Sequence, residues 1–505
     1  MTNTTDTSTD VSADELPSRG RVPTGLTGLD EILDGGYLDK RNYLVRGSPG
    51  VGKTLIGFHF LAAGVHADDR VLFINLGEAE SDIRQNAAQF GFGGEFETVP
   101  IVDLSPSAGY FTDAGDIFPP DEVEGRSVTQ EIVDEVLAHE PDRVVVDPLS
   151  QFRYLSTDEA HFRKQVLSFL KFLKESEATV VLTSESTTAT PDDDIQFMSD
   201  GVVTLDYSST ARTLEISKFR GSDFQGGTHA VRIDDDGMTV FPRLRPGKHR
   251  ADFSPDPISS GVPEMDQLLH GGLERGTVTL ISGPTGVGKT TTGAQFMKEA
   301  AGRGDRSVVY LFEEAKTTFL HRSEAIHMPV RDMIDRGTLA VKEIESLQLS
   351  SEELSNDIRH EIEEEDTGIV MIDGIEGYQH TIRGDSDRVV TELHALCSYL
   401  QNMGVTTILI GEVGAVTGDF RVTKHEISYL ADNVLFLRYL ELDGHLRKAI
   451  GVLKKRASDF ERTLRGFEIT EYGIAVGDPL TGLRGVLRGE PRWIEDSNTS
   501  AGSNG

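Results

Sequence analysis

The sequence has almost no cysteine and no long apolar run. Its one cysteine, Cys397, cannot form an internal disulfide, so we expect a reducing, cytoplasmic location. No apolar stretch approaches the roughly 20 residues that a helix needs to cross a bilayer. The N-terminal residues are polar and acidic, and they lack the basic and apolar segments of a secretory signal. These absences predict a cytoplasmic protein that does not enter a membrane.

Positive charge is also scarce. The 505 residues include 49 Lys and Arg against 83 Asp and Glu, which gives a formal net charge of −34. Only 15 of the 49 basic residues are lysine, so most of the cations are arginines, which suit bidentate phosphate or carboxylate contacts. Duplex DNA and anionic lipids repel a surface of this sign. Nucleic acid and membrane surfaces are therefore not the ligands that we expect.

An acid-rich, lysine-poor surface suits a protein that must stay hydrated at molar salt, where the Debye length falls to about 3 Å and self-repulsion is screened. We therefore expect a halophilic protein from a high-salt cytoplasm. Thermal unfolding measured against KCl concentration should show stability that rises with salt. A protein that is equally stable in dilute buffer would contradict this expectation.

The composition is that of a globular α/β protein. Hydrophobic residues make up 37% of the chain, aromatic residues 7%, and 52 residues are glycine. These values exclude collagen-like, coiled-coil and wholly disordered classes. At about 150 residues per domain the length fits three domains, but two domains of about 200 to 250 residues fit equally well.

An internal repeat favours two domains. The segment TGLTGLDEILDGG recurs as SSGVPEMDQLLHGG, and matched residues such as Gly25 and Gly261 are 236 positions apart. The same offset relates Lys218 to Lys454 near the ends of the two halves. A constant offset over this length indicates duplication of a whole domain. We predict a disordered tail over residues 1–17, domains over residues 18–248 and 249–490, and a flexible tail over residues 491–505.

Short β-branched runs alternate with helical stretches in both halves. Examples are VLFINL and RVVVD in the first half and SVVYLF and GIVMID in the second. Apolar runs of this length, without strict alternation, are typical of central parallel strands covered on both faces. The connections are long enough for crossover helices, so we predict two α/β domains, each with a mainly parallel sheet flanked by helices.

Each half contains one glycine-rich phosphate-binding motif. GSPGVGKT and GPTGVGKT fit the P-loop (Walker A) pattern, and each follows a predicted strand and precedes a predicted helix. Glycines let backbone N–H groups face phosphate oxygens, the lysine neutralises the outer phosphates, and the threonine offers a hydroxyl to Mg²⁺. A turn that merely matches the motif is the alternative, but it would have to occur twice in register. The predicted nucleotide-binding residues are Gly47, Ser48, Pro49, Gly50, Val51, Gly52, Lys53 and Thr54, and Gly283, Pro284, Thr285, Gly286, Val287, Gly288, Lys289 and Thr290.

A strand-end aspartate in each half is the predicted partner of magnesium. Asp147 ends RVVVD and Asp373 ends GIVMID, where a P-loop site places an acidic group against the hydrated cation. An aspartate that caps the strand-to-helix turn is the alternative. The matched placement favours the metal role, so the predicted magnesium residues are Thr54, Asp147, Thr290 and Asp373, with ATP and Mg²⁺ as cofactors.

Carboxylates that could activate water are distributed unequally. Glu313 and Glu314 follow the strand after the second P-loop helix, where a residue that polarises a water against the terminal phosphate is expected. The first half has Gly77 and Glu78 there. Two solvated acids in an acid-rich chain are the alternative. The asymmetry predicts that the second site is better equipped for hydrolysis and that the first holds nucleotide more than it turns it over.

Basic residues recur late in each domain. Lys218 and Arg220 in the first half correspond to Lys454 and Arg456 in the second. Cations that a neighbouring subunit donates to the terminal phosphate would account for them, as with an arginine finger. A hairpin whose charges face the solvent is the alternative.

Together these residues resemble the double-domain KaiC proteins of the RecA-like ATPase superfamily, whose archaeal relatives are called KaiC-like or GvpD/RadA-related. The resemblance spans roughly residues 20–495. It rests on the two entry segments, both P-loops, the Glu313–Glu314 pair, the KFRGS and KKRAS segments, and the C-terminal stretch DPLTGLRGVLRGEPRWI. It implies two tandem RecA-like P-loop NTPase domains.

The resemblance also implies a hexameric two-ring ATPase with ATP bound between subunits and autophosphorylation of adjacent Ser and Thr residues in the second ring. The family's phosphoacceptor stretch ITDSHISTITD falls on VTKHEISYLAD, which makes Ser428 the candidate acceptor. Tyr429 replaces the second acceptor, and Thr423 matches a nearby threonine implicated in phosphate transfer. Gly77 replaces the first glutamate of the N-terminal ring. These departures argue against a two-site phosphorylation cycle and against N-terminal hydrolysis.

The leading interpretation is a cytoplasmic Mg-ATP-dependent ATPase of KaiC type, assembled as a ring, with a serine/threonine autokinase activity in the second domain and an unidentified regulatory protein as partner. A nucleotide-gated scaffold with little hydrolysis is the second hypothesis, motivated by Gly77 and the altered acceptor pair. A RecA-like recombinase or helicase is the third. It needs basic DNA-facing loops, and the charge of −34 argues against it.

Overall fold

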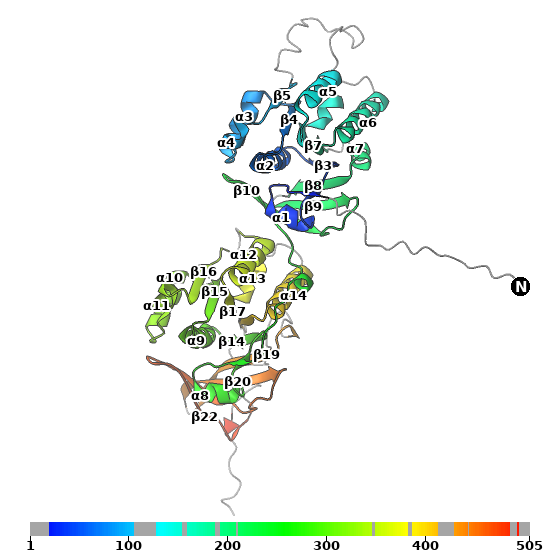
Figure 1. Cartoon of the computed structure of the whole chain (residues 1–505). Coiled ribbons are helices and arrows are strands. Elements are labelled where there is room, and N and C mark those ends of the chain that lie inside the picture. The colour runs from blue at the N-terminus through cyan, green and yellow to red at the C-terminus, as the bar shows by residue number, and fades with distance from the viewer. Residues whose placement is uncertain are drawn as a thin grey trace, which may run out of the picture. The chain divides into compact units, whose positions relative to one another are not determined.

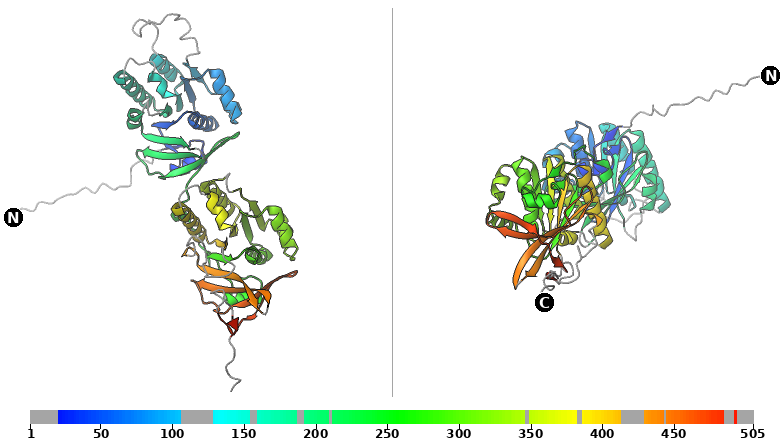
Figure 2. Two further views of the ribbon diagram at one scale, coloured as in Figure 1. Left: turned by 180° about the vertical axis from the view of Figure 1, so that it is seen from behind. Right: turned by 90° about the horizontal axis from the view of Figure 1, so that it is seen from below.

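The computed structural model describes residues 20–105, 128–153, 159–186, 192–208, 211–345, 349–381, 386–412, 429–442, 444–484 and 492–493. The chain divides into two compact units, unit 1 (Met1–Arg243) and unit 2 (Leu244–Gly505). The described residues of each unit form a nine-stranded mixed sheet. Helices lie on both faces of each sheet, as Figures 1 and 2 show. The predicted pair of tandem α/β domains is therefore confirmed.

The sheet of unit 1 has six parallel strands followed by three antiparallel ones at one edge. Apolar residues fill the parallel strands, and every residue of the two strands that contain VLFIN and RVVVD is buried. From the parallel edge the spatial order is β5 (Ile101–Asp103), β4 (Val71–Asn75), β6 (Arg143–Asp147), β7 (Thr179–Glu185), β3 (Asn42–Gly47), β8 (Gly201–Tyr207), β9 (Arg212–Phe219), β10 (Thr228–Asp234) and β11 (Gly237–Phe241).

Two hydrophobic clusters cover the faces of this sheet. Successive side chains of a strand point to opposite faces, so Val45 lies in one cluster and its neighbour Leu44 in the other. The first cluster includes residues of α1 (Thr27–Ile32), α2 (Lys53–His66), α3 (Glu80–Gln89) and α4 (Gly93–Phe96). The second includes residues of α5 (Val128–His139), the 3₁₀ helix η1 (Leu149–Arg153), α6 (Glu159–Glu175) and α7 (Asp193–Met198).

Unit 2 repeats this sheet strand for strand, with the same six parallel and three antiparallel members. The P-loop strand is again central, and in unit 2 every one of its residues is buried. From the parallel edge the spatial order is β16 (Leu339–Glu343), β15 (Arg306–Leu311), β17 (Thr367–Asp373), β18 (Thr406–Glu412), β14 (Val278–Gly283), β19 (Asn433–Leu442), β20 (His445–Lys455), β21 (Arg465–Thr470) and β22 (Gly473–Pro479).

The helices of unit 2 also form two layers. One cluster includes residues of α8 (Pro263–Leu268), α9 (Lys289–Gly302), α10 (Lys316–Glu324) and α11 (Val330–Asp335). The other includes residues of α12 (Ser351–Glu363), α13 (Ile375–Thr381) and α14 (Ser386–Asn402). A capping box explains where α12 begins, because Ser350 and Glu353 each accept a hydrogen bond from the other's backbone N–H.

The described residues also form three short two-stranded sheets. They are β1 (Arg21–Val22) with β2 (Tyr37–Leu38), β12 (Pro257–Ile258) with β13 (Leu273–Glu274), and β23 (Leu483–Arg484) with β24 (Arg492–Trp493). The last strand lies within the residues for which a flexible tail is predicted. Among the described residues, no helix is both long and apolar enough to span a membrane.

The segment that opens unit 2 packs against α14. Asn402 Nδ2 donates to the carbonyl of Pro246, in the 3₁₀ helix η2 (Pro246–Lys248), at 2.8 Å, and the N–H of Ala251 donates to the carbonyl of Asn402 at 3.0 Å. The predicted domain boundary, after residue 248, falls inside this segment.

A buried ion pair distinguishes unit 2 from unit 1. Lys455 Nζ donates to Glu274 Oε1 at 2.6 Å, and both residues are buried. Burial by itself raises the pKa of the Glu274 carboxyl, but the hydrogen bond from Lys455 helps to hold that pKa below its usual value. Unit 1 has the buried residues Phe219 and Leu38 at the corresponding positions.

Replacing only one member of this pair should destabilise unit 2. We expect Lys455→Phe to lower the free energy of unfolding by about 3 kcal/mol, because it leaves the Glu274 carboxylate buried without its cation. Combining Lys455→Phe with Glu274→Leu copies the apolar pair of unit 1 and should restore most of that loss. Denaturant unfolding measures both variants, and a single variant as stable as the parent would contradict the expectation.

Candidate nucleotide-binding sites

Both P-loops lie where a central parallel strand ends, between β3 and α2 in unit 1 and between β14 and α9 in unit 2. Gly52 and Gly288 directly precede the helices and have φ of 107° and 117°, a region that strains residues with a Cβ atom. A Cβ on Gly288 would also lie 2.5 Å from Ile469 Cδ1. Glycine is therefore required for a loop that directs N–H groups and a helix N-terminus at one anion.

In unit 1 the P-loop lysine and threonine lie close to the strand-end aspartate. Lys53 is buried, and its Nζ donates to the carbonyl of Gly47 at 3.1 Å. Thr54 Oγ1 donates to Asp147 Oδ2 at 2.7 Å, and Thr183 donates to the other carboxylate oxygen. Burial raises the pKa of Asp147 against these hydrogen bonds, and burial lowers the pKa of Lys53.

Unit 2 repeats this arrangement. Lys289 Nζ donates to the carbonyl of Pro284 at 3.1 Å, and Thr290 Oγ1 donates to Asp373 Oδ1 at 3.2 Å. Burial raises the pKa of Asp373 to about 6 and lowers the pKa of Lys289. The structure thus brings the predicted phosphate-binding and magnesium residues together in each unit.

The oxygen donors of the two sites suit magnesium. Each site offers one threonine hydroxyl and one aspartate carboxylate, and Mg²⁺ usually binds through one or two protein ligands, several waters and the phosphates of a substrate. Within the described ranges there is no group of three or more His, Cys, Asp or Glu that could hold a metal by itself. The residues therefore fit a magnesium ion that comes with the nucleotide.

The two adjacent glutamates of unit 2 have different surroundings. Glu314 Oε2 forms an ion pair with Arg322 Nη2 of α10 at 2.9 Å. Glu313 lies against Gly374, where an added Cβ would be 2.9 Å from Glu313 Cγ, and its carboxylate interacts electrostatically with Lys289. Burial raises the pKa of Glu313, and neighbouring carboxylates raise it further. Glu313 is therefore the member of the pair whose carboxylate interacts with the P-loop lysine.

Unit 1 lacks both this glutamate and the space that it occupies. Gly77 stands at the position of Glu313, and Pro148 stands at the position of Gly374. A Cβ on Gly77 would lie 3.0 Å from Pro148 Cδ, which is tighter than an ordinary contact. The glutamate and the glycine that accommodates it are therefore both absent from unit 1.

The acidic residue that unit 1 retains corresponds to the paired glutamate of unit 2. Glu78 Oε2 accepts a hydrogen bond from Asn86 Nδ2 at 3.1 Å. Asn86 stands where unit 2 has Arg322, the partner of Glu314. Burial raises the pKa of Glu78, and Asp147 raises it further.

Three carboxylates beside the P-loop lysines were not predicted from the sequence: Glu185, Glu412 and Glu376. Glu185 ends β7 beside Gly47, and Glu412 ends β18 beside Gly283. Both interact electrostatically with the lysine of their own P-loop, as does Glu376 of α13 in unit 2. The sequence pattern that could have identified Glu185 and Glu412 is a glutamate directly after a predicted strand, VVLTS or TILIG.

The basic pair of unit 1 lies away from the unit's own P-loop. Lys218 Nζ and Arg220 Nη2 donate to the carbonyl of Phe197 at 3.0 and 3.3 Å. Lys218 pairs with Val202 near the start of β8, whereas the P-loop follows the end of β3, which runs parallel to β8. The cations and the P-loop therefore lie at opposite ends of the sheet.

The basic pair of unit 2 is held in the same way. Lys454 Nζ donates to the carbonyl of Ala431 at 2.5 Å, and Arg456 Nη2 donates to the carbonyl of Tyr429 at 3.2 Å. These contacts precede β19, at the end of the sheet away from the P-loop. Ser428, the candidate phosphoacceptor, lies outside the described residues.

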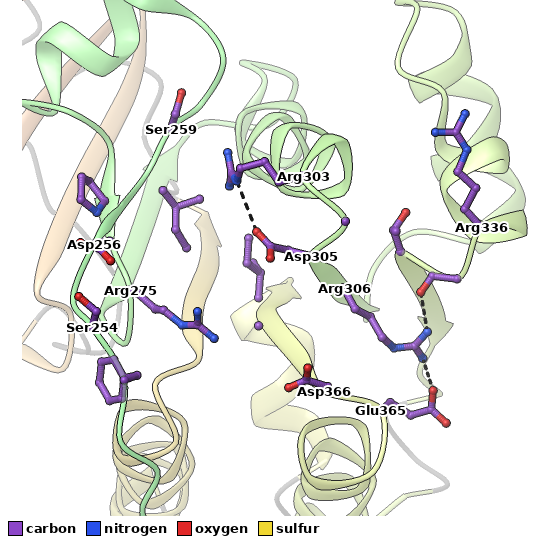
Figure 3. Close-up of a pocket in the computed structure, with 18 of the residues that line it drawn as sticks. Ser254, Asp256, Ser259, Arg275, Arg303, Asp305, Arg306, Arg336, Glu365 and Asp366 are labelled. Carbon is purple, nitrogen blue, oxygen red and sulfur yellow. Dashed lines mark hydrogen bonds and ion pairs between the residues drawn. The ribbon is translucent and has the colours of Figure 1, made fainter.

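A separate cavity of 810 Å³ lies at the opposite end of the unit 2 strands, around the first residues of β15 and β17 (Figure 3). Its lining carries both signs of charge, and Arg303 pairs with Asp305 at 3.4 Å while Arg306 pairs with Glu365 at 3.5 Å. The cavity is therefore distinct from the phosphate-binding loops, and its lining does not favour anions alone.

The chain matches the family model described as ATPase: KaiC twice, over residues 22–245 and 258–481. It is 26% identical over 492 residues to the circadian clock oscillator protein KaiC of Acaryochloris marina, covering 94% of this chain and 92% of the relative. It is 26% identical over 496 residues to the circadian clock protein KaiC3 of a Synechocystis strain, covering 94% and 95%. Both matches extend across the two P-loop units. The chain belongs to the KaiC ATPase family and contains two tandem copies of its domain.

Proposed function

We propose that the protein is a Mg-ATP-dependent ATPase that binds ATP in both units and hydrolyses it mainly in unit 2. The position of Glu313 carries this proposal, because its carboxylate acts electrostatically on Lys289 and lies against the residue that follows Asp373. A carboxylate at this position can take a proton from a water that attacks the terminal phosphate. Its raised pKa makes it a stronger base than an exposed glutamate.

The residues of unit 2 have separate tasks in this scheme. The P-loop N–H groups and Lys289 would bind the phosphates, and Thr290 and Asp373 would hold the magnesium ion. The bound ion supplies charge neutralisation at the phosphate oxygens. Glu313 holds the attacking water and takes its proton at a carboxylate oxygen. Glu314, through its ion pair with Arg322, fixes the backbone that carries Glu313.

Unit 1 serves chiefly as a nucleotide-holding unit in this proposal. It keeps Lys53, Thr54 and Asp147 in the arrangement of unit 2, so it should bind Mg-ATP. It has Gly77 and Pro148 where unit 2 has Glu313 and its glycine neighbour. This difference favours a nucleotide-gated scaffold, the second candidate function, for unit 1 alone.

We further propose ring assembly, in hexamers by analogy with the family, with Lys218, Arg220, Lys454 and Arg456 acting on the neighbouring subunit's nucleotide. The location of these cations at the opposite end of the sheet from their own P-loops supports action in trans. An exposed aromatic residue lies beside the basic pair in both units: Phe197 is 76% exposed and Tyr429 is 51% exposed. An exposed aromatic next to a basic pair is typical of an interface residue.

Regulation is the proposed biological role. The relatives are named as circadian clock proteins, which supports a function in signalling with a regulatory protein as partner. Autophosphorylation of Ser428 would make the second unit a serine/threonine autokinase. The net charge of −34 favours a high-salt cytoplasm and argues against nucleic acid as a ligand.

Removing the Glu313 carboxylate should stop hydrolysis without stopping binding. In a Lys53→Ala background, which confines ATP to unit 2, we expect Glu313→Gln to lower phosphate release about 100-fold or more, because general-base catalysis is lost. Glu314→Gln is the matched control and should lower it about tenfold at most. Phosphate release and bound ATP are measured on the same samples, and unchanged release by Glu313→Gln would refute the role of this residue.

Mixed rings should reveal the cations that act in trans. Lys289→Ala lacks phosphate binding in unit 2, and Lys454→Ala with Arg456→Ala lacks the donated cations, so each protein alone should be inactive in unit 2. An equimolar mixture should regain about a quarter of the parent activity, since one in four random interfaces pairs an intact P-loop with intact cations.

The mixing experiment is performed after ring exchange with the unit 1 P-loop intact, and the phosphate release of the unmixed proteins is subtracted. Arg462→Ala, which removes an exposed cation that pairs with Asp459 and lies over the Phe460 ring, is the control and should keep its activity unmixed. A mixture as inactive as its components would contradict action in trans.

A further inference from the structure

The unit 2 site contains carboxylates that the unit 1 site lacks. Glu376 of α13 stands three residues after Asp373, and unit 1 has Ser150 three residues after Asp147. Glu313 likewise has Gly77 as its counterpart. The two sites therefore share a phosphate-binding frame but differ in charge.

A chain of hydrogen bonds ties Glu376 to the P-loop. Thr285 Oγ1, within the loop, donates to Glu412 Oε1 at 2.6 Å, and the backbone N–H of Glu412 donates to Glu376 Oε1 at 3.2 Å. Glu376 Oε2 is buried and has no hydrogen-bond partner among the described residues. In unit 1 the first link is absent, because Pro49 stands at the position of Thr285 and has no hydroxyl.

The charge that surrounds each P-loop lysine differs accordingly. Four carboxylates interact with the ammonium group of Lys289, and two interact with that of Lys53. The four are Glu412, Asp373, Glu376 and Glu313, and the two are Glu185 and Asp147. Counting only each lysine and the carboxylates that interact with it, the charge is 1 − 4 = −3 in unit 2 and 1 − 2 = −1 in unit 1.

We propose that Glu376 and the Glu412–Thr285 pair make unit 2 selective for nucleotide that carries a divalent cation, whereas unit 1 also accepts the metal-free polyphosphate. Resting on the proposed function, this inference specifies which form of ATP each site takes. Free ATP brings further negative charge to a site that already has an excess of carboxylates, and a bound divalent cation reduces that repulsion by neutralising part of the phosphate charge. One unit charge at about 12 Å and an effective dielectric of about 20 changes a binding constant about tenfold.

Partly buried carboxylates are screened less by salt than exposed ones. The selectivity should therefore persist at the KCl concentrations that the acidic surface is expected to require. It should also be independent of catalysis, because Glu376 acts on the charge of the site and takes no proton from water.

Equilibrium dialysis of full-length protein with radiolabelled ATP tests the proposal. Lys53→Ala leaves only the unit 2 site, and Lys289→Ala leaves only the unit 1 site. For each protein the Kd is measured in excess MgCl₂ and in EDTA, and the magnesium ratio is defined as Kd in EDTA divided by Kd in MgCl₂. We expect this ratio to be about 100-fold larger for the unit 2 site, because its lysine has two more carboxylates around it and each contributes about tenfold.

Matched variants remove the Glu376 carboxylate from unit 2 or introduce a carboxylate at the corresponding position of unit 1. In the Lys53→Ala protein, Glu376→Ser should lower the magnesium ratio about tenfold by improving binding in EDTA, with Kd in MgCl₂ changed by less than about twofold. Glu376→Gln keeps the size of the side chain and should act in the same way. In the Lys289→Ala protein, Ser150→Glu should raise the ratio.

The outcomes separate the two claims. Equal magnesium ratios for the two sites, or a Glu376→Ser effect that is the same in MgCl₂ and EDTA, would overturn the charge-selectivity inference and leave ATP binding intact. Failure of both single-site proteins to bind ATP in excess MgCl₂ would overturn the proposed function, and the inference with it.

Discussion

The hydrogen bond between the P-loop threonine and the strand-end aspartate organises each nucleotide site. It joins Thr54 to Asp147 at 2.7 Å and Thr290 to Asp373 at 3.2 Å. Both partners must lie at the carboxyl ends of their strands. This is possible because the P-loop strand and the aspartate strand run parallel, with one strand between them. The buried apolar strands and the two helix layers provide this frame. Most other site residues can differ between the units because they lie around this fixed pair.

The two units show how a duplicated site diverges in a coupled way. In unit 2, Glu313 fits because its neighbour Gly374 has no side chain. In unit 1, both residues differ: Gly77 replaces the glutamate, and Pro148 replaces the glycine. Two positions that are far apart in sequence have therefore changed together. The same holds for Lys455 with Glu274, whose counterparts Phe219 and Leu38 are both apolar. The two units therefore differ at pairs of positions that lie in contact, and not only at single residues.

Much of the frame could be predicted because it depends on local patterns. Apolar runs identify buried parallel strands, and the repeat identifies two similar domains. The P-loops and their aspartates follow strand ends, so their meeting at one edge follows from the topology of a parallel sheet. The separate surroundings of Glu313 and Glu314 could not be predicted, because they depend on Arg322 of another helix. The contribution of Glu376 depends on a contact with Glu412, 36 residues away. Ser428 lies outside the described residues, so its part in phosphate transfer stays a prediction.

The most direct test of the account measures bound ATP and released phosphate for the two single-site proteins in Mg-ATP at high salt. The account predicts that Lys53→Ala and Lys289→Ala each bind about one ATP per chain where the parent binds about two, since each substitution removes the lysine of one P-loop. It also predicts that Lys53→Ala keeps most of the phosphate release and that Lys289→Ala loses most of it. Equal phosphate release by the two proteins, or release that survives mainly in Lys289→Ala, would contradict the assignment of hydrolysis to unit 2.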